Sequence, residues 1–424
     1  MDLSNDISTQ SPDPPKGSGD YLNSEAKHNF PSYLPFHVES AVCYFWGRMQ
    51  KIPLMVPWLD EAEIEAVSEV IRSGWITQGP AVKRFEEAFK ERVGSEDAVA
   101  VSNCTTGLHL ALIAAGIKPD DEVIVPSFSF IASTNSVIHA GAVPVFADIA
   151  IETGNLTVES IASAVTDKTR AVMIVHQAGV PADLDEISQF CNGRGLTLIE
   201  DAACAIGSTY KDQIIGSYSD LVVFSFHPRK VVTTGEGGMI ATSNSDWASR
   251  LRRLREHGMS LSAADRHAAQ GVSIESYSEP GFNFRMTDVQ AAIGIVQLSK
   301  LDEMVAKRRE LAHRYIEAFS SIDGIYPVTD PPYGTTNFQS FWIRLDPDLG
   351  LSRSKLMSDL DQKGITTRRG IMTAHREAAC SRFARNPLPV SENLSDNSLI
   401  LPLYQGMSHA EQDYVIESLT QVIR

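Results

Sequence analysis

The stretch FSFHPRKVVTTGEGG, residues 224–238, places a lysine where a buried strand is expected to end. It begins apolar, breaks at Pro228, and sets down Lys230 directly after the break. Burying a charged amine is costly, and desolvation drives a lysine toward its neutral form. A neutral amine can attack a carbonyl and form a Schiff base, so Lys230 is a candidate nucleophile. The alternative is a surface lysine in a loop.

A second stretch, LTLIEDAACAIGS (196–208), ends an apolar run with two carboxylates, Glu200 and Asp201. A buried carboxylate needs a cationic partner, or its pKa rises. The alternative for Asp201 is a helix cap, which is common for aspartate.

A third stretch, VSNCTTGLHLAL (101–112), passes from an apolar run through small residues into a helical pattern. Small residues let backbone N–H groups approach a ligand, and a helix N-terminus favours an anion. The stretch is neither a Walker A loop nor a G-x-G-x-x-G turn. It is a candidate phosphate cradle, with an ordinary helix cap as the alternative.

Together the three stretches match one cofactor. Pyridoxal phosphate needs a lysine for its aldehyde, a carboxylate for its ring nitrogen and an anion cradle for its phosphate. An aromatic residue for the face of the ring is available in PSFSFI, 126–131.

These stretches have to be positioned by an alternation of strands and helices. Short apolar runs predict seven strands, with helix-length segments between most of them, including one at 106–115. The predicted strands are 97–101, 122–125, 143–146, 171–175, 196–199, 221–226 and 238–241. Such alternation predicts an α/β fold with a mainly parallel sheet covered on both faces, which binds ligands at the carboxyl ends of its strands.

The pattern changes near Asp288. Thr287 to Gln290 resembles a capping box, and a long amphipathic helix is expected to follow and to lead into a smaller domain. We therefore predict a largely disordered N-terminal extension at 1–50, a large cofactor-binding domain at 51–299 and a small C-terminal α+β domain at 300–424.

Composition narrows the possible partners and the compartment. The formal net charge of −16 argues against nucleic acid and anionic membranes as general partners. The sequence contains no run of about 18 apolar residues, so no membrane span is predicted. The first 20 residues do not resemble a signal peptide. The five cysteines have no zinc-site spacing, so no metal is expected, and their low number fits a cytoplasmic protein.

The order and spacing of the motifs resemble the DegT/DnrJ/EryC1/StrS family, the sugar aminotransferases among the fold type I pyridoxal-phosphate enzymes. The resemblance covers about residues 53–420. Its marks are SGWITQGP (73–80), NCTTGLHLAL (103–112), PSFSFIAS (126–133), IEDAACAIGS (199–208), FSFHPRKVVTTGEGG (224–238), GFNFRMTDVQAAIG (281–294) and LPLY (401–404).

The resemblance implies roles around the cofactor ring. Lys230 resembles the lysine that forms the internal aldimine and moves the proton, and Asp201 the aspartate that pairs with the pyridinium nitrogen. Phe130 matches the residue that stacks on the ring. Ser225 matches a phosphate-binding serine, and Cys204 stands where the family usually has Gln or His bonded to the ring hydroxyl.

The resemblance also implies further contacts. Cys104 and Thr105 match the phosphate loop. Asn283 matches an asparagine that reaches the phosphate from the neighbouring subunit, which implies a homodimer, and Arg285 is a candidate for the carboxylate of the amino donor. The other candidates for substrate contacts are Trp75, Arg368 and Arg369, with Arg252 and Arg253 as further candidates for a diphosphate.

The implied function is transamination of a nucleotide-linked keto-sugar by an amino acid, glutamate in the family, for amino-sugar or polysaccharide biosynthesis. One alternative is a dehydratase that uses the same cofactor but has histidine in place of the lysine. The other is a non-catalytic regulatory protein that binds the cofactor. The presence of both Lys230 and Asp201 favours the aminotransferase.

Overall fold

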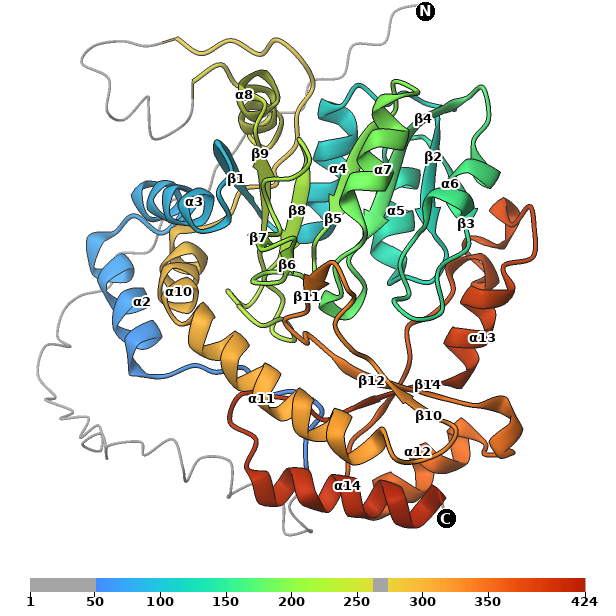
Figure 1. The fold of residues 1–424 in the computed structure, drawn as a ribbon. Helices are drawn as coiled ribbons and strands as arrows, with labels where there is room; N and C mark the ends of the chain where they lie inside the picture. Colours follow the sequence, from blue (N-terminus) through green and yellow to red (C-terminus); the bar gives the residue numbers. More distant parts are fainter. Residues whose placement is uncertain (1–50, 262–273, 424) are drawn as a thin grey trace, which may run out of the picture. The chain divides into compact units, whose positions relative to one another are not determined.

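The computed structural model describes residues 51–261 and 274–423 (Figure 1). Residues Arg48–Arg424 belong to one compact unit. The predicted disordered extension at 1–50 lies outside the described residues.

A seven-stranded sheet forms the centre of the unit, in the order β1-β9-β8-β5-β4-β2-β3. All pairs are parallel except those of β9, which runs antiparallel to β1 and β8. The strands are β1 (Asp97–Val101), β2 (Glu122–Pro126), β3 (Val143–Ala147), β4 (Thr169–Val175), β5 (Thr197–Asp201), β8 (Val222–Ser225) and β9 (Gly238–Thr242). The predicted α/β class and all seven predicted strands are confirmed.

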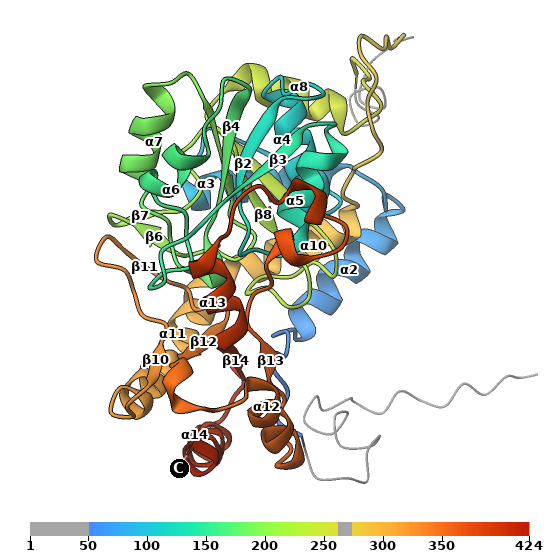
Figure 2. The same cartoon turned by 90° about the vertical axis from the view of Figure 1, so that its right-hand side faces the viewer.

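Successive side chains of a strand point to opposite faces of the sheet, so the strands contribute side chains to two separate hydrophobic cores. In Figure 2, α6 and α7 lie on one side of the sheet and α4, α5 and α8 on the other. The helices around the sheet are α2 (Glu61–Ser73), α3 (Pro80–Val93), α4 (Cys104–Ala114), α5 (Ile131–His139), α6 (Val158–Ala164), α7 (Leu184–Asn192) and α8 (Ser245–Leu254).

The predicted helix after Asp288 is two helices. The capping box is confirmed: the Thr287 side chain accepts a hydrogen bond from the backbone N–H of Gln290, whose side chain bonds back to Thr287. The expectation of one long helix is wrong, since α10 (Asp288–Ser299) and α11 (Leu301–Phe319) meet at Lys300. The division lets α10 pack on α2 and α3, while α11 packs on β10 and α14.

A second, antiparallel sheet follows α11, in the order β10-β12-β14-β13. A small three-stranded sheet, β11-β6-β7, joins a strand that follows α11 to two strands that follow β5. The elements of these parts are β6 (Thr209–Tyr210), β7 (Gln213–Ile214), β10 (Ile325–Pro327), β11 (Gly334–Thr335), β12 (Phe341–Leu345), α12 (Arg353–Gln362), β13 (Arg368–Arg369), α13 (Pro389–Asn397), β14 (Ser398–Leu401) and α14 (His409–Ile423).

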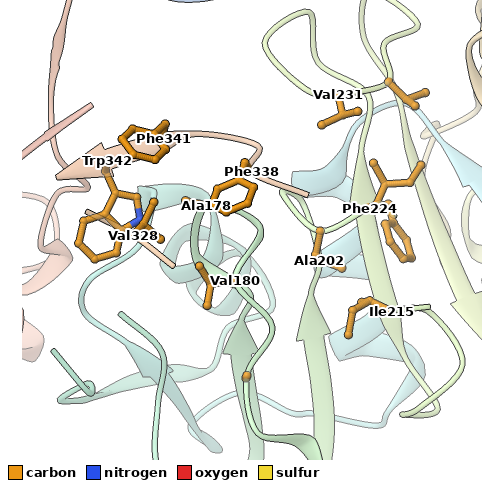
Figure 3. Close-up of a cluster of buried hydrophobic side chains, with 14 of the residues drawn as sticks. Ala178, Val180, Ala202, Ile215, Phe224, Val231, Val328, Phe338, Phe341 and Trp342 are labelled. Atoms are coloured by element: carbon orange, nitrogen blue, oxygen red, sulfur yellow. The ribbon is translucent and has the colours of Figure 1, made fainter. Parts of the chain in front are cut away.

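One apolar cluster connects the second sheet to the strand ends of the first. Figure 3 shows Phe341 and Trp342 on one side, Phe224 and Val231 on the other, and Phe338 between them. The segment between β11 and β12 therefore runs directly past the carboxyl ends of the central strands. In the described ranges, no helix combines the length and apolar character needed to cross a membrane.

Candidate active site

Lys230 lies in a turn just beyond the end of β8. Its backbone N–H donates to the carbonyl of His227 at 2.8 Å, and its side chain is half-buried. Its Nζ donates to Sγ of Cys204 at 3.1 Å. The residue expected at the ring hydroxyl and the candidate nucleophile are thus in direct contact.

Asp201, the last residue of β5, is almost fully buried, at 4% exposure. Its Oδ2 accepts from Oγ of Ser133 at 2.7 Å, and its Oδ1 accepts from the backbone N–H of Ala203 at 3.1 Å. The thiol of Cys104 lies 4.0 Å from Oδ1. No described residue forms an ion pair with Asp201, and burial raises the pKa of its carboxyl despite these hydrogen bonds. A buried carboxylate of this kind is suited to a cationic ligand.

The charge state of Lys230 differs from the expectation drawn from its burial. Burial lowers the pKa of Lys230, but the hydrogen bond to Cys204 and the electrostatic influence of Cys204, Cys104 and Asp201 raise it, and the net shift is upward. The expectation of a lysine made neutral by desolvation alone is therefore wrong for the chain without its cofactor. A cation that pairs with Asp201 would offset the negative charge that Asp201 presents to Lys230.

The N-terminus of α4 opens toward the same strand ends. The helix begins at Cys104, two residues before the predicted start, and Asn103 caps it by accepting from the backbone N–H of Thr106 at 2.9 Å. A Cβ at Gly238 would lie 2.8 Å from the backbone nitrogen of Cys104, so only glycine allows β9 to approach this closely.

Ser225 lies beside this helix end, because it pairs with Gly238 across β8 and β9. Thr105 occupies the first turn of α4. The three residues expected at a phosphate, Cys104, Thr105 and Ser225, are thus brought together by two strands and a helix. Backbone N–H groups at such a helix end can hold an anion.

Phe130 precedes α5 and is 60% exposed, which is unusual for phenylalanine. It stands directly before the first turn of α5, in which Ser133 donates to Asp201. A segment distant in sequence holds the chain before this turn: Oγ of Ser127 lies 2.6 Å from Nδ1 of His375, and the backbone N–H of Ala374 donates to the carbonyl of Ser127 at 2.8 Å.

The substrate candidates are spread more widely. Asn283 is exposed, and neither its side chain nor that of Arg285 makes a hydrogen bond or ion pair with a described residue. Trp75 is half-buried, and its Nε1 donates to the carbonyl of Gln78 at 3.1 Å. Arg252 is bound to Asp97 at 2.8 Å, at the opposite end of β1 from the site, so its prediction as a diphosphate contact is not supported.

Arg368 and Arg369 form β13, an edge strand of the second sheet, and both residues are exposed. Burial and the nearby guanidinium groups of Arg229 and Arg369 lower the pKa of Arg368. Arg229, which directly precedes Lys230, forms no ion pair with a described residue. Sequence reasoning missed Arg229, although its place beside Lys230 was a usable signal.

The residues of the site fit pyridoxal phosphate. The buried carboxylate of Asp201, which has no ion pair with a described residue, lies at the carboxyl ends of β5 and β8 together with the lysine and the helix end with its close glycine. Among the described residues no group of His, Cys, Asp and Glu could hold a metal ion.

Comparison with known proteins gives a consistent result. The sequence profile of the DegT/DnrJ/EryC1/StrS aminotransferase family matches residues 57–420. The chain is 37% identical over 382 residues to the spore coat polysaccharide biosynthesis protein SpsC of Bacillus subtilis, which covers 89% of this chain and 98% of SpsC.

Solved structures agree with the sequence match. The aminotransferase TlmJ of Streptoalloteichus hindustanus superposes with a TM-score of 0.80 at 35% identity, covering 87% of this chain and 97% of TlmJ. DesV of S. venezuelae, solved in complex with a ketimine intermediate, superposes with a TM-score of 0.81 at 30% identity, covering 88% of this chain and 99% of DesV. These similarities confirm the predicted fold type I aminotransferase architecture.

Proposed function

Because the chain belongs to the DegT/DnrJ/EryC1/StrS aminotransferase family, and is therefore a pyridoxal-phosphate-dependent sugar aminotransferase, we propose its substrates and the roles of its residues. It transfers the amino group of an amino acid, glutamate, to a keto-sugar linked to a nucleotide. The product is an amino sugar for a polysaccharide or a glycosylated natural product.

The observation that carries the proposal is the buried carboxylate of Asp201. It has two hydrogen-bond donors within 3.1 Å and forms no ion pair with a described residue. A protonated pyridine nitrogen would supply the missing charge, and the carboxylate would keep that nitrogen protonated. When bound, the cofactor supplies an electron sink for the bond that breaks at Cα of the amino acid.

Lys230 has two tasks in this proposal. Its amine would hold the cofactor through the aldehyde, and the same amine would move a proton to and from Cα of the substrate. Cys204 lies 3.1 Å from that amine and orients it toward the ring. The presence of Lys230 together with Asp201 weighs against both the dehydratase and the non-catalytic alternative.

The nucleotide is the part of the substrate that needs positive charge. Arg368 has a pKa lowered by burial and by its neighbouring guanidinium groups, Arg229 and Arg369, so an anion placed among them would relieve their mutual repulsion. A diphosphate has the charge and the size for this role. Arg285, which has no partner among the described residues, is assigned to a carboxylate of the amino donor.

The active unit is proposed to be a homodimer. Asn283 is exposed in the single chain, and the family resemblance assigns it to the phosphate of the partner's cofactor. A two-fold dimer would then complete two sites at one interface.

A substrate screen tests the proposal. The cofactor-loaded protein is incubated with L-glutamate and a panel of nucleotide-linked keto-sugars, and products are identified by mass spectrometry. We expect one sugar whose keto oxygen is replaced by an amino group, with 2-oxoglutarate formed in equal amount. A dehydrated sugar without nitrogen would instead support the dehydratase. The Lys230→Arg variant, which keeps the positive charge, is the inactive control.

A further inference from the structure

The segment 336–340, between β11 and β12, is buried against the active site although it follows α11 in the chain. Thr336, Asn337, Phe338 and Gln339 are between 0% and 6% exposed. Polar side chains are rarely buried so completely unless they are hydrogen-bonded, so the partners of Asn337 and Gln339 show what the segment holds.

Gln339 holds the backbone on both sides of Lys230. Its Oε1 accepts from the backbone N–H of Val231 at 2.8 Å, and its Nε2 donates to the carbonyl of Arg229 at 2.6 Å. These peptide groups fix the orientation of the amide, because one can only donate and the other can only accept. One glutamine therefore binds the chain immediately before and immediately after the lysine.

Asn337 holds the backbone of the residue that Lys230 touches. Its Nδ2 donates to the carbonyls of Cys204 at 2.9 Å and Ile206 at 2.8 Å. Its Oδ1 accepts from the backbone N–H of Gln339 at 2.8 Å, so the two anchors are joined. The fit is close: a Cβ at Gly179 would lie 2.0 Å from Oδ1 of Asn337.

A buried arginine fixes the segment from behind. Nε of Arg308 donates to the carbonyl of Phe338 at 2.9 Å, and Nη2 donates to the carbonyl of Gln339 at 2.7 Å. Arg308 is 0% exposed and has no ion pair within the described ranges. Burial lowers its pKa to about 9, which still leaves the guanidinium charged at neutral pH.

The backbone of the segment is also held in an uncommon conformation. Phe338 has φ of +47°, a region that costs a non-glycine residue on the order of 1–3 kcal/mol and persists only where the surroundings impose it. Such positions cluster at functional sites, which agrees with the contacts of Asn337 and Gln339.

From these contacts we infer that Gln339 is a positioning residue for Lys230. Its amide fixes the peptide groups beside the lysine, so that Nζ is presented at one distance from Cys204 and from the cofactor, while Arg308 keeps Gln339 in place. The inference rests on the role assigned to Lys230 in the proposed function. It adds that the reach of the amine is set from a segment beyond α11, outside the β8 turn that carries it.

The test compares two buried glutamines. Gln339→Met removes both hydrogen bonds beside Lys230 at nearly constant volume. Gln412→Met is the matched control: Gln412 is 0% exposed, and its Nε2 donates to the carbonyl of Leu311 at 2.6 Å, between α14 and α11. Gln339→Glu is a second variant that keeps an acceptor for Val231 but removes the donor to Arg229.

Three measurements distinguish positioning from folding. For Gln339→Met we expect kcat to fall about 10- to 100-fold with KM nearly unchanged, as expected when a reacting group is misplaced by about 1 Å. The pH midpoint of the absorbance of the lysine-bound cofactor should shift. In the cofactor-free protein, the peptide that contains Lys230 should exchange its amide hydrogens faster. Gln412→Met should lower the melting temperature but change none of these three.

If Gln339→Met lowers only the melting temperature, as the control does, the segment is merely structural and the inference is wrong. If Gln339→Met does not fold, the same criteria apply to Gln339→Glu. The proposed function fails separately. Wild-type protein that attaches its cofactor to another lysine would refute the role of Lys230, and wild-type protein that transaminates no keto-sugar would refute the proposed substrate, whatever the variants do.

Discussion

Asp201→Asn is expected to change the stability of the cofactor-free protein and the affinity for the cofactor in opposite directions. Burial raises the pKa of Asp201 above the usual carboxyl value of about 3.9. Between that value and the raised pKa, the folded chain binds more protons than the unfolded chain. The free energy of unfolding therefore falls as pH rises through this window.

The structure indicates how large each effect should be. Asparagine resembles the protonated carboxyl in shape and charge, and Ser133 and Ala203 can still bond to it, so the variant should show no such fall. At neutral pH the cofactor-free variant should be at least as stable as the wild type. With the cofactor, loss of the buried partner of a pyridinium should cost about 3 kcal/mol or more. That is roughly a hundredfold, divided between cofactor affinity and turnover.

The assay is denaturant unfolding of cofactor-free wild type and Asp201→Asn from acid to neutral pH, with cofactor titration and turnover measured alongside. If the free energies of unfolding of the wild type and of Asp201→Asn change in parallel with pH, Asp201 does not have a raised pKa. Unchanged cofactor affinity together with unchanged turnover would show that Asp201 is not the partner of the ring nitrogen. The first result would refute the predicted pH dependence of stability, and the second would refute the assignment of Asp201 to the ring nitrogen.

Three further predictions test the rest of the site. Borohydride should fix the cofactor onto the peptide that contains Lys230, and Lys230→Ala should keep some cofactor but lose turnover; label on another lysine contradicts the assignment. Mixing inactive Lys230→Ala with inactive Asn283→Ala subunits should restore activity through one intact site per mixed dimer, and no recovery despite proven exchange would place each site within one chain. Cys204→Gln should be tolerated, and Cys204→Ala should lower the free energy of unfolding by about 1 kcal/mol or less, since one weak hydrogen bond to the amine is lost. Both variants should shift the pH midpoint of the cofactor absorbance. An unchanged midpoint in both would show that Cys204 only fills space in the core.

The central sheet was predictable because parallel strands buried on both faces are continuous apolar runs. The parallel arrangement also predicted where the site lies, because the carboxyl ends of β5 and β8 are at the same edge of the sheet. Asp201 is the last residue of β5, and Lys230 follows β8. The division of α10 from α11 at Lys300 was not predictable, because the apolar spacing continues through it. The domain boundary near residue 300 stays a prediction.

The residues that hold the site residues in place could not be predicted from the sequence, for a different reason. Ser133 is 68 positions from Asp201, His375 is 248 from Ser127, and Gln339 is 110 from Arg229. No local spacing relates such pairs, and each residue taken alone is an ordinary polar residue. Ser133 reaches Asp201 from the first turn of α5, whereas His375 and Gln339 belong to the chain after α11, which returns to the strand ends of the first sheet. A sequence therefore reveals the groups that meet the cofactor, because their types are dictated by its chemistry. The residues that position these groups need only a hydrogen bond of suitable length, which many residue types supply. Such positioning residues are identified only in the folded chain.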